Sequence, residues 1–428
     1  MLSIELIRRD PDYVRKALES RGEEDPLAEL LELDAQRRQA VTQGDELRAR
    51  RNQVSRQIGQ LRSSGRELPQ DVVEEMRQVG EQVSQLEQQV RELDERIHAI
   101  LLGLPNIPRP DVPQGLSEAD NVIVRHWGGP RAFDFTPLPH WELGEKSGII
   151  DFQRGAKLSG SRFYTMSGFG AKLERAIIFW MLDLHTREHG YTELMLPILV
   201  RREVMEGSGN LPKFADNLYH DDEDDLWLIP TAEVPITNLH RDEILPPDAL
   251  PIYYVAETPC FRREKAAAGR DTRGIKRVHQ FNKVEMYKFV APDTSDAELD
   301  KLVADAEEVC QRLGLAYRVV QLCTGDMSFP SAKSFDIEVW AGGCQEWLEV
   351  SSCSNCANFQ ARRASIRYRP APGARPEFVH TLNGSGLALP RVIIAIMENY
   401  QQEDGSIVIP EALRPYTGFD VIPAPSNR

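Results

Sequence analysis

Apolar residues recur at alternating steps of four and three along the chain between positions 72 and 100. They are Val72, Met76, Val79, Val83, Leu86, Val90, Leu93, Ile97 and Ile100. This spacing is typical of the apolar seam of a coiled coil. A weaker seven-residue repeat precedes it at Ala40, Leu47, Val54 and Leu61, and residues 63–69 interrupt the pattern with Gly65 and Pro69. We predict an antiparallel helical hairpin over about residues 27–102, each helix ~50 Å long.

A proline-rich segment follows the predicted hairpin at residues 104–115. Such a composition is typical of a linker, so we predict an N-terminal domain over residues 1–103 and a second domain over residues 116–428. In the second domain, amphipathic helices mix with short alternating strands, without a regular strand–helix–strand rhythm. We therefore expect an α+β fold around an antiparallel sheet.

An apolar helix and a short strand are predicted near the start of the second domain. The helix runs for about 18 residues from Ala171, and the strand over residues 191–197 is halted by Pro197. The apolar face of the helix comprises Leu173, Ile177, Trp180, Met181 and Leu184. This pair fits the core of the domain or a contact between two copies of the chain.

Two strands flank a basic, polar loop at residues 265–274. We place Arg262 and Glu264 on the outgoing strand, and the returning strand alternates so that Phe281 and Glu285 share one face. An arginine, an aromatic ring and a carboxylate can hold a phosphate, stack on a planar base and bind an ammonium group. The alternative is a solvated hairpin tip without a ligand.

Three further segments carry polar groups next to predicted strands or helices. Thr231 and Glu233 follow a strand, where they could hold an ammonium-bearing ligand or simply cap a helix. Glu349 precedes two serines at a predicted strand end, and hard oxygen ligands suit magnesium. Gly384 and Gly386 precede an apolar helix that carries Arg391, which suits either a phosphate site or a tightly packed helix start.

Two candidate metal motifs have simpler explanations. Cys353 and Cys356 form a lone CxxC pair without a partner pair at zinc-finger spacing, so free thiols compete with a metal site. The acidic cluster at residues 221–225 lies between two strand-like runs and fits a hairpin turn better than a metal site.

The net charge of −15 argues against indiscriminate coating of nucleic acid, but it leaves a local nucleic-acid site possible. The N-terminus lacks a signal-peptide run, no segment approaches a membrane span, and six scattered cysteines suit a reducing compartment, which favours the cytoplasm.

The first hairpin helix carries seven arginines and no lysine, namely Arg37, Arg38, Arg48, Arg50, Arg51, Arg56 and Arg62. Guanidinium groups suit phosphates, so an arm that binds folded RNA competes with ordinary interhelical ion pairs.

Together these segments resemble the class II aminoacyl-tRNA synthetases, and within them the bacterial-type seryl family. The helix and strand ending at Pro197 resemble the first class motif, residues 261–285 the second, and residues 384–391 the third. The helical hairpin, the Thr231–Glu233 triplet and the run at residues 269–281 narrow the resemblance to the seryl family. Residues 349–355, 359–363 and 398–401 extend it, so that it covers essentially the whole chain.

The resemblance implies activation of serine with ATP, release of pyrophosphate, and transfer of serine to the terminal adenosine of its tRNA. It implies serine contacts at Thr231, Ala232, Glu233, Arg262, Glu285 and Ser385. It implies ATP contacts at Arg262, Arg263, Glu264, Val278, Phe281, Glu349, Val350, Ser351, Ser352 and Arg391. Within these sets Arg262, Arg391 and Glu349 would be catalytic, Phe281 would stack on adenine, and Glu349 with Ser352 would hold Mg²⁺.

The resemblance also implies a homodimer and a tRNA-binding arm, in which Arg48, Arg51 and Arg56 are our candidate contacts. The seryl family commonly charges the selenocysteine tRNA as well, and the sequence leaves this open. Four residues depart from the family pattern. Arg263 and Lys265 make the loop start more basic, and Ala388 and Pro390 replace glycines in the third motif. Proline is tolerated in a first helical turn, so we expect the ATP site to persist.

Two other functions fit parts of the sequence. The first is a ligase that activates an amino acid for a carrier protein, against which the arginine-bearing hairpin argues. The second is a non-catalytic coiled-coil RNA-binding or scaffold protein, against which the presence of Arg262, Glu285 and Arg391 together argues.

Overall fold

The computed structural model describes residues 1–63, 70–265 and 273–425. The predicted tip of the hairpin and most of the basic loop lie outside the described residues, as do the side chains of Leu61 and Arg62. The chain divides into two compact units. One comprises Leu2–Glu19 and Glu23–Leu104, and the other comprises Met1, Ser20–Gly22 and Pro105–Arg428.

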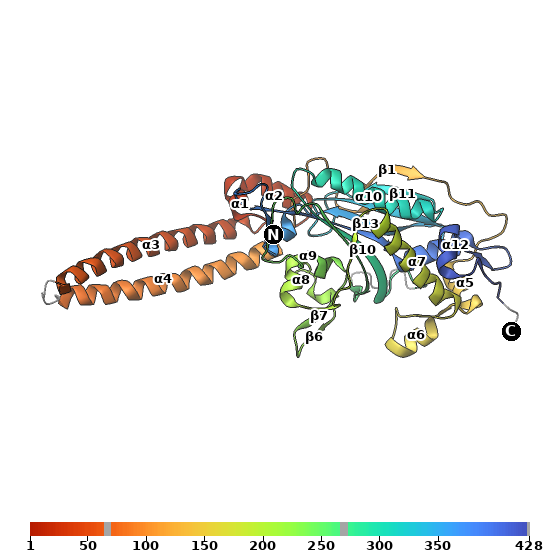
Figure 1. Cartoon of the computed structure of the whole chain (residues 1–428), viewed down its shortest axis with the longest axis horizontal. Coiled ribbons are helices and arrows are strands. Elements are labelled where there is room, and N and C mark those ends of the chain that lie inside the picture. The colour runs from red at the N-terminus through yellow and green to blue at the C-terminus, as the bar shows by residue number, and fades with distance from the viewer. Residues whose placement is uncertain (64–69, 266–272, 426–428) are drawn as a thin grey trace. The chain divides into compact units, whose positions relative to one another are not determined.

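The first unit is helical. Its elements are α1 (Ile4–Arg9), α2 (Pro11–Ser20), α3 (Leu27–Ser63) and α4 (Gln70–Gly103). The long helices α3 and α4 lie side by side (Figure 1). Ion pairs join Arg37 to Asp94 and Arg48 to Glu87, so the pairing runs antiparallel. Four residues of the predicted seam are buried, Val79, Val83, Leu93 and Ile97, which confirms the coiled-coil hairpin.

The second unit is built around an eight-stranded sheet in the order β1-β11-β12-β13-β16-β10-β9-β4. The strands in that order are Val122–Trp127, Tyr317–Gln321, Lys333–Ala341, Glu346–Asn355, His380–Ala388, Gln280–Val290, Ile252–Phe261 and Thr192–Glu193. Neighbours pair antiparallel except β4 with β9, which confirms the predicted α+β fold. The strand predicted over residues 191–197 is much shorter than expected, because only Thr192 and Glu193 pair with β9.

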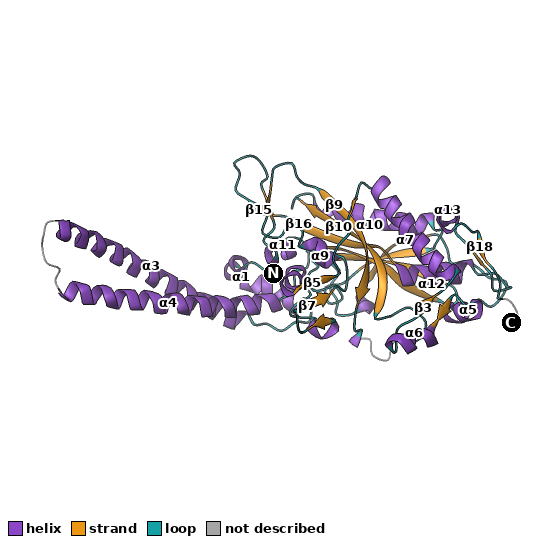
Figure 2. Ribbon diagram, turned by 60° about the horizontal axis from the view of Figure 1, so that its bottom comes forward, coloured by secondary structure: helices purple, strands orange, loops and turns teal. Residues whose placement is uncertain are grey.

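Helices α7 (Phe169–Arg187), α10 (Ser295–Arg312) and α12 (Leu389–Tyr400) pack with the sheet in the main hydrophobic core, and Figure 2 shows them beside the strands. The short helices α9 (Glu233–Thr237) and α11 (Phe359–Arg363) contribute to a second core. Strand β10 separates the two because successive side chains point to opposite faces. Val284 and Met286 enter the main core, whereas Tyr287 and Phe289 enter the second. Glu285 therefore points to the same side as α9.

Shorter elements complete the second unit. They are α5 (His140–Ser147), β2 (Ile150–Asp151), α6 (Phe152–Ser159), β3 (Thr165–Met166), β5 (Leu199–Arg201), α8 (Arg202–Ser208), β6 (His220–Asp221), β7 (Leu226–Leu228), β8 (Ile244–Leu245), β14 (Arg367–Tyr368), β15 (Glu377–Phe378), β17 (Ile407–Val408), α13 (Arg414–Thr417) and β18 (Val421–Ile422). The acidic cluster forms the turn between antiparallel β6 and β7, as predicted. Within the described ranges, no helix is long and apolar enough to cross a membrane.

One predicted strand boundary is wrong. Strand β9 ends at Phe261, so Arg262 and Glu264 lie beyond it. The ladder stops there because the backbone N–H of Arg263 donates to the carbonyl of Asn217, and Glu264 adopts a positive φ of 50°. The glycine segment before the last helix, for which no strand was predicted, is part of strand β16.

The glycines of β16 serve close packing. A Cβ at Gly384 would lie 2.9 Å from Cys353 Sγ, and one at Gly386 would lie 2.6 Å from His185 Nε2. These positions lack side chains because neighbouring elements press against the strand. The two glycines therefore fit the tight-packing interpretation, while Asn383, Ser385 and Arg391 of the same segment line a cavity, so the phosphate-site alternative stays a prediction.

Candidate active site

A cavity of about 280 Å³ opens on the second unit, between the sheet and the start of α12. Strands β10, β13 and β16 supply about half of its lining. The segments that follow β7 and β9, the start of α12 and Ser328 supply the rest. The lining residues are Thr231, Glu233, Arg262, Glu264, Lys276, Arg277, Val278, Phe281, Lys283, Glu285, Ser328, Glu349, Ser352, Ser354, Asn383, Ser385, Ala388, Pro390 and Arg391. The structure thus brings together eleven of the predicted site residues from segments far apart in the sequence.

Two arginines and a carboxylate form the cationic end of this cavity. Arg391 lies in the first turn of α12, where Pro390 is accommodated as expected. Its Nη1 donates to the carbonyl of Glu349 at 2.6 Å and lies 3.2 Å from the Glu349 carboxylate. Arg262 is held by its Nε, which donates to the carbonyl of Pro230 at 3.3 Å. Arg262 can therefore turn both of its terminal nitrogens, and Arg391 its Nη2, toward an anion in the cavity.

A bulge in β13 turns Glu349 into the cavity. Ser351 pairs with Ile337 but Glu349 pairs with Glu338, so Val350 is the extra residue in the ladder. Without it, Glu349 and Ser352 would lie on opposite faces, because they are three positions apart. The prediction that these residues lie at a strand end is wrong. They lie inside β13, and the bulge places both on the cavity side.

The carboxylates beside Arg391 differ in charge state. Burial raises the pKa of Glu349, but Arg391, Arg262 and Arg277 outweigh it and hold the pKa below its ordinary value. Burial, and secondly the negative charge of Glu349, raises the pKa of Asp336 on the neighbouring strand. Glu349 is therefore the ionised member of the pair. Asp336 Oδ1 is buried without a hydrogen-bond partner in the described structure.

The opposite end of the cavity is a buried polar group. The Thr231 hydroxyl donates to Glu285 Oε2 at 2.8 Å and accepts from Lys283 Nζ at 3.0 Å. Lys283 also forms an ion pair with Glu285, and both side chains are at least nine-tenths buried. The backbone N–H of Glu233 donates to the same threonine oxygen at 3.2 Å. The N-cap of α9 is nevertheless Ala232, which makes no side-chain capping bond, and the ligand site at Thr231 stays a prediction.

Glu233 lies at the start of α9 with its Oε1 accepting a hydrogen bond of 2.6 Å from Gln360. Burial, followed by the nearby charge of Glu285, raises the pKa of Glu233 to about 7. Two carboxylates, Glu233 and Glu285, thus line the same cavity as Ser385. A small ligand that carries an ammonium and a hydroxyl group has partners for both here.

The remaining wall is partly apolar. Phe281 and Val278 line it, and the Arg262 guanidinium carbon lies 5.3 Å from the centre of the Phe281 ring. Glu264 closes this wall with its carboxylate 3.7 Å from Arg277 Nη1. The exposed ring offers a stacking surface for a planar base beside the cationic end.

Four predicted contact residues do not line the cavity. Ala232 and Val350 are fully buried in the core, and the Ser351 hydroxyl donates to the carbonyl of Ser385 at 2.6 Å. Arg263 turns away, donating to the carbonyl of Leu218 and lying over the ring of Tyr219. Contacts of these residues with ATP or serine stay predictions.

Sequence reasoning did not single out several cavity residues as ligand contacts. They are Lys276, Arg277, Lys283, Ser328, Ser354 and Asn383. Lys283 could have been found, because it shares the period-two face of Phe281 and Glu285. Asn383 and Ser354 pair across β16 and β13, which no local pattern reveals.

The remaining candidates have clear structural settings. Arg48 is engaged with Glu87 and Asp45, whereas Arg51 and Arg56 are exposed on α3 and form no ion pair with the described residues. Cys353 and Cys356 are free, buried thiols. Among the described residues they belong to no cluster that could hold a metal ion.

Two family models match the chain. The model of the seryl-tRNA synthetase N-terminal domain matches residues 1–108, and that of the class II tRNA synthetase core domain (G, H, P, S and T) matches residues 214–400. A serine–tRNA ligase of Thermomicrobium roseum is 64% identical over 98% of this chain and 94% of its own length. That of Roseiflexus castenholzii is 58% identical over 98% of both chains.

The solved structures agree with these relatives. The seryl-tRNA synthetase of Pyrococcus horikoshii, crystallised with ATP, superposes with a TM-score of 0.94 at 40% identity over the full length of both chains. Sequence, fold and the convergence of the class II motifs on one cavity therefore lead to the same assignment: this chain belongs to the seryl-tRNA synthetase family, the ligases that join serine to tRNA.

Proposed function

We propose that the cavity binds ATP and L-serine side by side and forms seryl-adenylate before serine passes to the terminal adenosine of tRNA. The observation that carries this assignment of sites is the pairing of two arginines with a buried threonine–glutamate–lysine group in one cavity. The serine carboxylate would attack the α-phosphorus of ATP, the bond to the β-phosphate oxygen would break, and pyrophosphate would leave.

In this scheme, catalysis comes from two effects: the arginines stabilise negative charge, and the cavity orients the two reactants. Arg262 lies between the stacking wall and the polar end, where it can bind the α-phosphate and the serine carboxylate together. Arg391 at the far end would hold the γ-phosphate. A fixed array of guanidinium groups stabilises charge in the transition state and orients the reactants without a nucleophilic side chain.

The residues beside Arg391 fit a magnesium ion. Glu349 is an ionised oxygen ligand, Ser352 lies on the same face, and Asp336 leaves an unpartnered oxygen nearby. Mg²⁺, when bound, supplies positive charge to the triphosphate. Glu349 itself would additionally orient Arg391 through their ion pair.

The polar end would recognise serine. Glu285 and Thr231 would receive its ammonium group, and Glu233 and Ser385 would lie close to its hydroxyl. Alanine lacks the serine hydroxyl and would leave buried polar groups of the site without a hydrogen-bond partner. The enzyme should therefore prefer serine to alanine by ~10⁴-fold or more. Gln360, which fixes Glu233, would help to set this preference.

The other proposals concern the partners and the domains. The helical unit, residues 1–103 in the predicted boundaries, would bind tRNA(Ser) through Arg51 and Arg56, with 104–115 as linker and 116–428 as catalytic domain. We also propose that the chain charges tRNA(Sec) with serine. Exposed apolar residues on and near α7 support a homodimer. A cytoplasmic location stays a prediction from the sequence.

Amino-acid-dependent ATP–pyrophosphate exchange tests the activation step. We expect exchange with serine and, across a panel of amino acids, much slower exchange with alanine, threonine and glycine. Exchange with serine without charging of tRNA would favour the carrier-protein ligase, and no exchange with any amino acid would leave only the scaffold function.

A further inference from the structure

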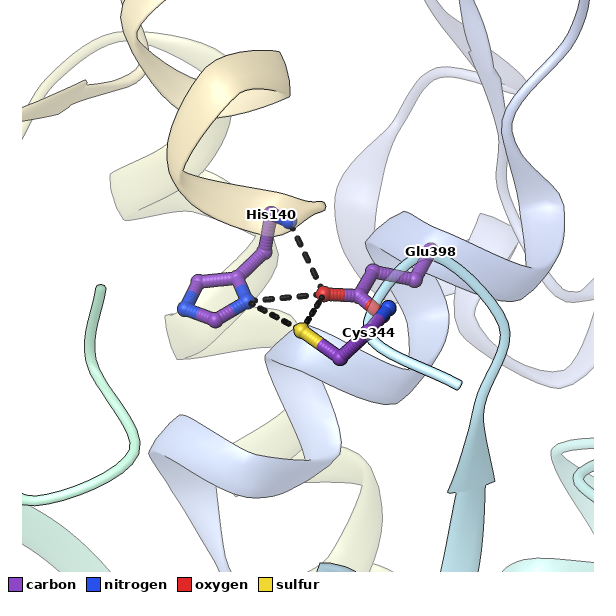
Figure 3. A group of neighbouring side chains, drawn as sticks. All are labelled: His140, Cys344 and Glu398. Carbon is purple, nitrogen blue, oxygen red and sulfur yellow. Dashed lines mark hydrogen bonds and ion pairs between the residues drawn. The ribbon is translucent and has the colours of Figure 1, made fainter. Parts of the chain in front are cut away.

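A buried histidine outside the cavity touches the segment that forms one of its walls. His140 begins α5, Glu398 lies near the end of α12, and Cys344 lies in the turn between β12 and β13 (Figure 3). His140 and Glu398 have fully buried side chains. Their ligand atoms and the Cys344 sulfur lie within 4.8 Å of one another.

Glu398 acts as the centre of this cluster. Its Oε1 accepts from the backbone N–H of His140 at 2.9 Å, from the ring Nδ1 at 2.8 Å and from the Cys344 thiol at 3.0 Å. Its Oε2 accepts from the backbone N–H groups of Gly343 and Cys344 at 2.9 and 2.8 Å. The carboxylate thus joins α5, α12 and the β12–β13 turn, and its oxygens are already well supplied with donors.

The other ring nitrogen of His140 reaches the end of the basic loop. The backbone N–H of Ile275 donates to His140 Nε2 at 3.1 Å. Only the neutral tautomer with its proton on Nδ1 satisfies both Glu398 and Ile275. Burial lowers the pKa of His140, which favours this neutral form, although Glu398 partly offsets the effect.

This tautomer argues against a metal at the cluster. A metal on Nδ1 would place the ring proton on Nε2, where it would face the N–H of Ile275 donor to donor. The close distances of the three side chains are therefore better explained by hydrogen bonding than by coordination.

The backbone at residues 274–278 is packed against the ring and then enters the cavity. Gly274 has a φ of +76°, and a Cβ there would lie 2.0 Å from His140 Nε2. Lys276, Arg277 and Val278 follow and line the cavity. The carbonyl of Lys276 accepts from Arg391 Nε at 3.5 Å, so this short segment also contacts the proposed γ-phosphate arginine.

We propose that His140 is a positioning residue for ATP: held by Glu398, it fixes the backbone at Ile275 and thereby places Lys276, Arg277 and Val278 along the ATP wall. This inference rests on the proposed function of the cavity. It predicts an effect on ATP, because residues 274–278 form the wall beside Phe281. Serine should be affected little, since its proposed partners Thr231, Glu233, Arg262, Glu285 and Ser385 all lie outside residues 274–278.

Variants of the full chain separate the two bonds of the ring. His140→Asn retains a donor near the Nδ1 position and loses the acceptor for Ile275, whereas His140→Gln can place its amide oxygen near the Nε2 position. Cys344→Ser is the matched control, because it changes a side chain of the same cluster and leaves the bond from Ile275 to the ring in place, while the serine hydroxyl can still meet Lys276, which the Cys344 thiol contacts. We expect the Asn variant to raise the KM for ATP about tenfold and the KM for serine less than twofold in pyrophosphate exchange. The Gln variant should stay within about threefold, and the control within twofold, of the unmodified chain for ATP.

Amide hydrogen exchange supplies a readout that does not depend on activity. Residues 274–278 should exchange faster in the Asn variant than in the unmodified chain or the Cys344→Ser control. Unchanged exchange and an unchanged KM for ATP in the Asn variant would overturn the proposal. The proposal would also be overturned if the KM for ATP rose equally in the Asn and Gln variants and in proportion to the fall in their Tm. Stabilisation of the unmodified chain, but not of the control, by added Zn²⁺ would show a metal site and also overturn it.

The two proposals fail in different ways. If the unmodified chain lacks serine-dependent exchange, the proposed function fails, while hydrogen exchange at Ile275 still tests the role of His140. If the Asn variant does not fold, a tenfold rise in the ATP KM of the Gln variant would contradict the proposal.

Discussion

At the scale of single residues, the polar end of the cavity depends on a carboxylate that has only buried partners. Glu285 is 2% exposed and is neutralised by Lys283 and Thr231. Its position on β10 follows from the alternation visible in the sequence, but its partner Thr231 is 54 residues away. Replacing it disturbs the serine site and leaves Lys283 without its counter-ion.

Glu285→Ala should lower kcat/KM for serine by about 10²–10³-fold, which corresponds to ~3–4 kcal/mol, because the serine ammonium group would lose its buried carboxylate partner. Pyrophosphate exchange measures this, and isothermal titration should show that ATP still binds. Glu257→Ala on β9 is the matched control, since Glu257 is a half-buried carboxylate outside the cavity lining and should leave serine activation intact. Full serine activation by the Glu285 variant would contradict the assignment.

Glu233 should make serine use depend on pH. Its pKa of about 7 means that the side chain is neutral below pH 7 and charged above it. The charged form accepts a hydrogen bond from the serine hydroxyl more strongly than the neutral form does, so kcat/KM for serine should rise by up to tenfold between pH 6 and 8. Glu233→Gln should remove this rise. A rise of the same size in that variant would assign the pH dependence to another group.

The same shift predicts a change in stability with the opposite sign. The folded state holds the Glu233 proton more tightly than the unfolded state, in which the pKa is near 4.5. Its contribution to stability is therefore complete below about pH 4.5 and is lost as the pH rises to about 7. Urea unfolding at several pH values should show a smaller decline over this range in Glu233→Gln than in the unmodified chain.

At the scale of elements, α3 carries two kinds of arginine. Arg37, Arg48 and Arg50 are paired with acidic residues of α4, as the interhelical alternative in the sequence suggested. Arg51 and Arg56 are exposed, and Arg56 borders a shallow groove on α3. The arginine row is thus partly structural, and among its described side chains only Arg51 and Arg56 are available to a polyanion without breaking an ion pair.

Arg51→Glu combined with Arg56→Glu should raise the KM for tRNA about tenfold or more in aminoacylation. Serine-dependent pyrophosphate exchange should stay within twofold, because the cavity belongs to the other compact unit. The salt dependence of tRNA affinity should also weaken, by a slope of about 1–2 for two lost phosphate contacts. Arg77→Glu on α4 is the control, as Arg77 pairs only with residues of its own helix among those described. Unchanged tRNA affinity in the double variant would exclude these arginines.

At the scale of the whole molecule, exposed apolar side chains identify a candidate surface for self-association. One side of α7 is buried in the main core, yet Phe179 is 54% exposed, and Met195 after β4 is 100% exposed. Large apolar side chains that cluster on a surface often mark an interface, and two-fold dimers are the commonest assembly.

Phe179→Glu should convert a dimer into a monomer at micromolar concentration, because a charge would be buried without a partner at the interface. Analytical ultracentrifugation measures the change. Tyr13→Glu on α2, 44% exposed in the helical unit, is the control and should leave the mass unchanged. A dimer that persists in the Phe179 variant has two explanations: the interface lies elsewhere, or one charge does not disrupt it. Met195→Glu would then be measured, and a monomer in that variant would keep the interface on this surface, whereas a dimer would place it elsewhere.

The sequence by itself determined the helical hairpin, the α+β class and eleven of the residues that line the cavity. The heptad seam is a local period, and the class motifs keep Arg262, Phe281 and Glu285 within one hairpin, so short-range patterns suffice. Tertiary structure alone decided the face on which Glu349 lies, because a single bulged residue in β13 reverses the alternation. It also decided that Gly384 and Gly386 serve packing, and that His140 reaches Ile275 across 135 positions, since such contacts arise only when distant strands and helices are brought together.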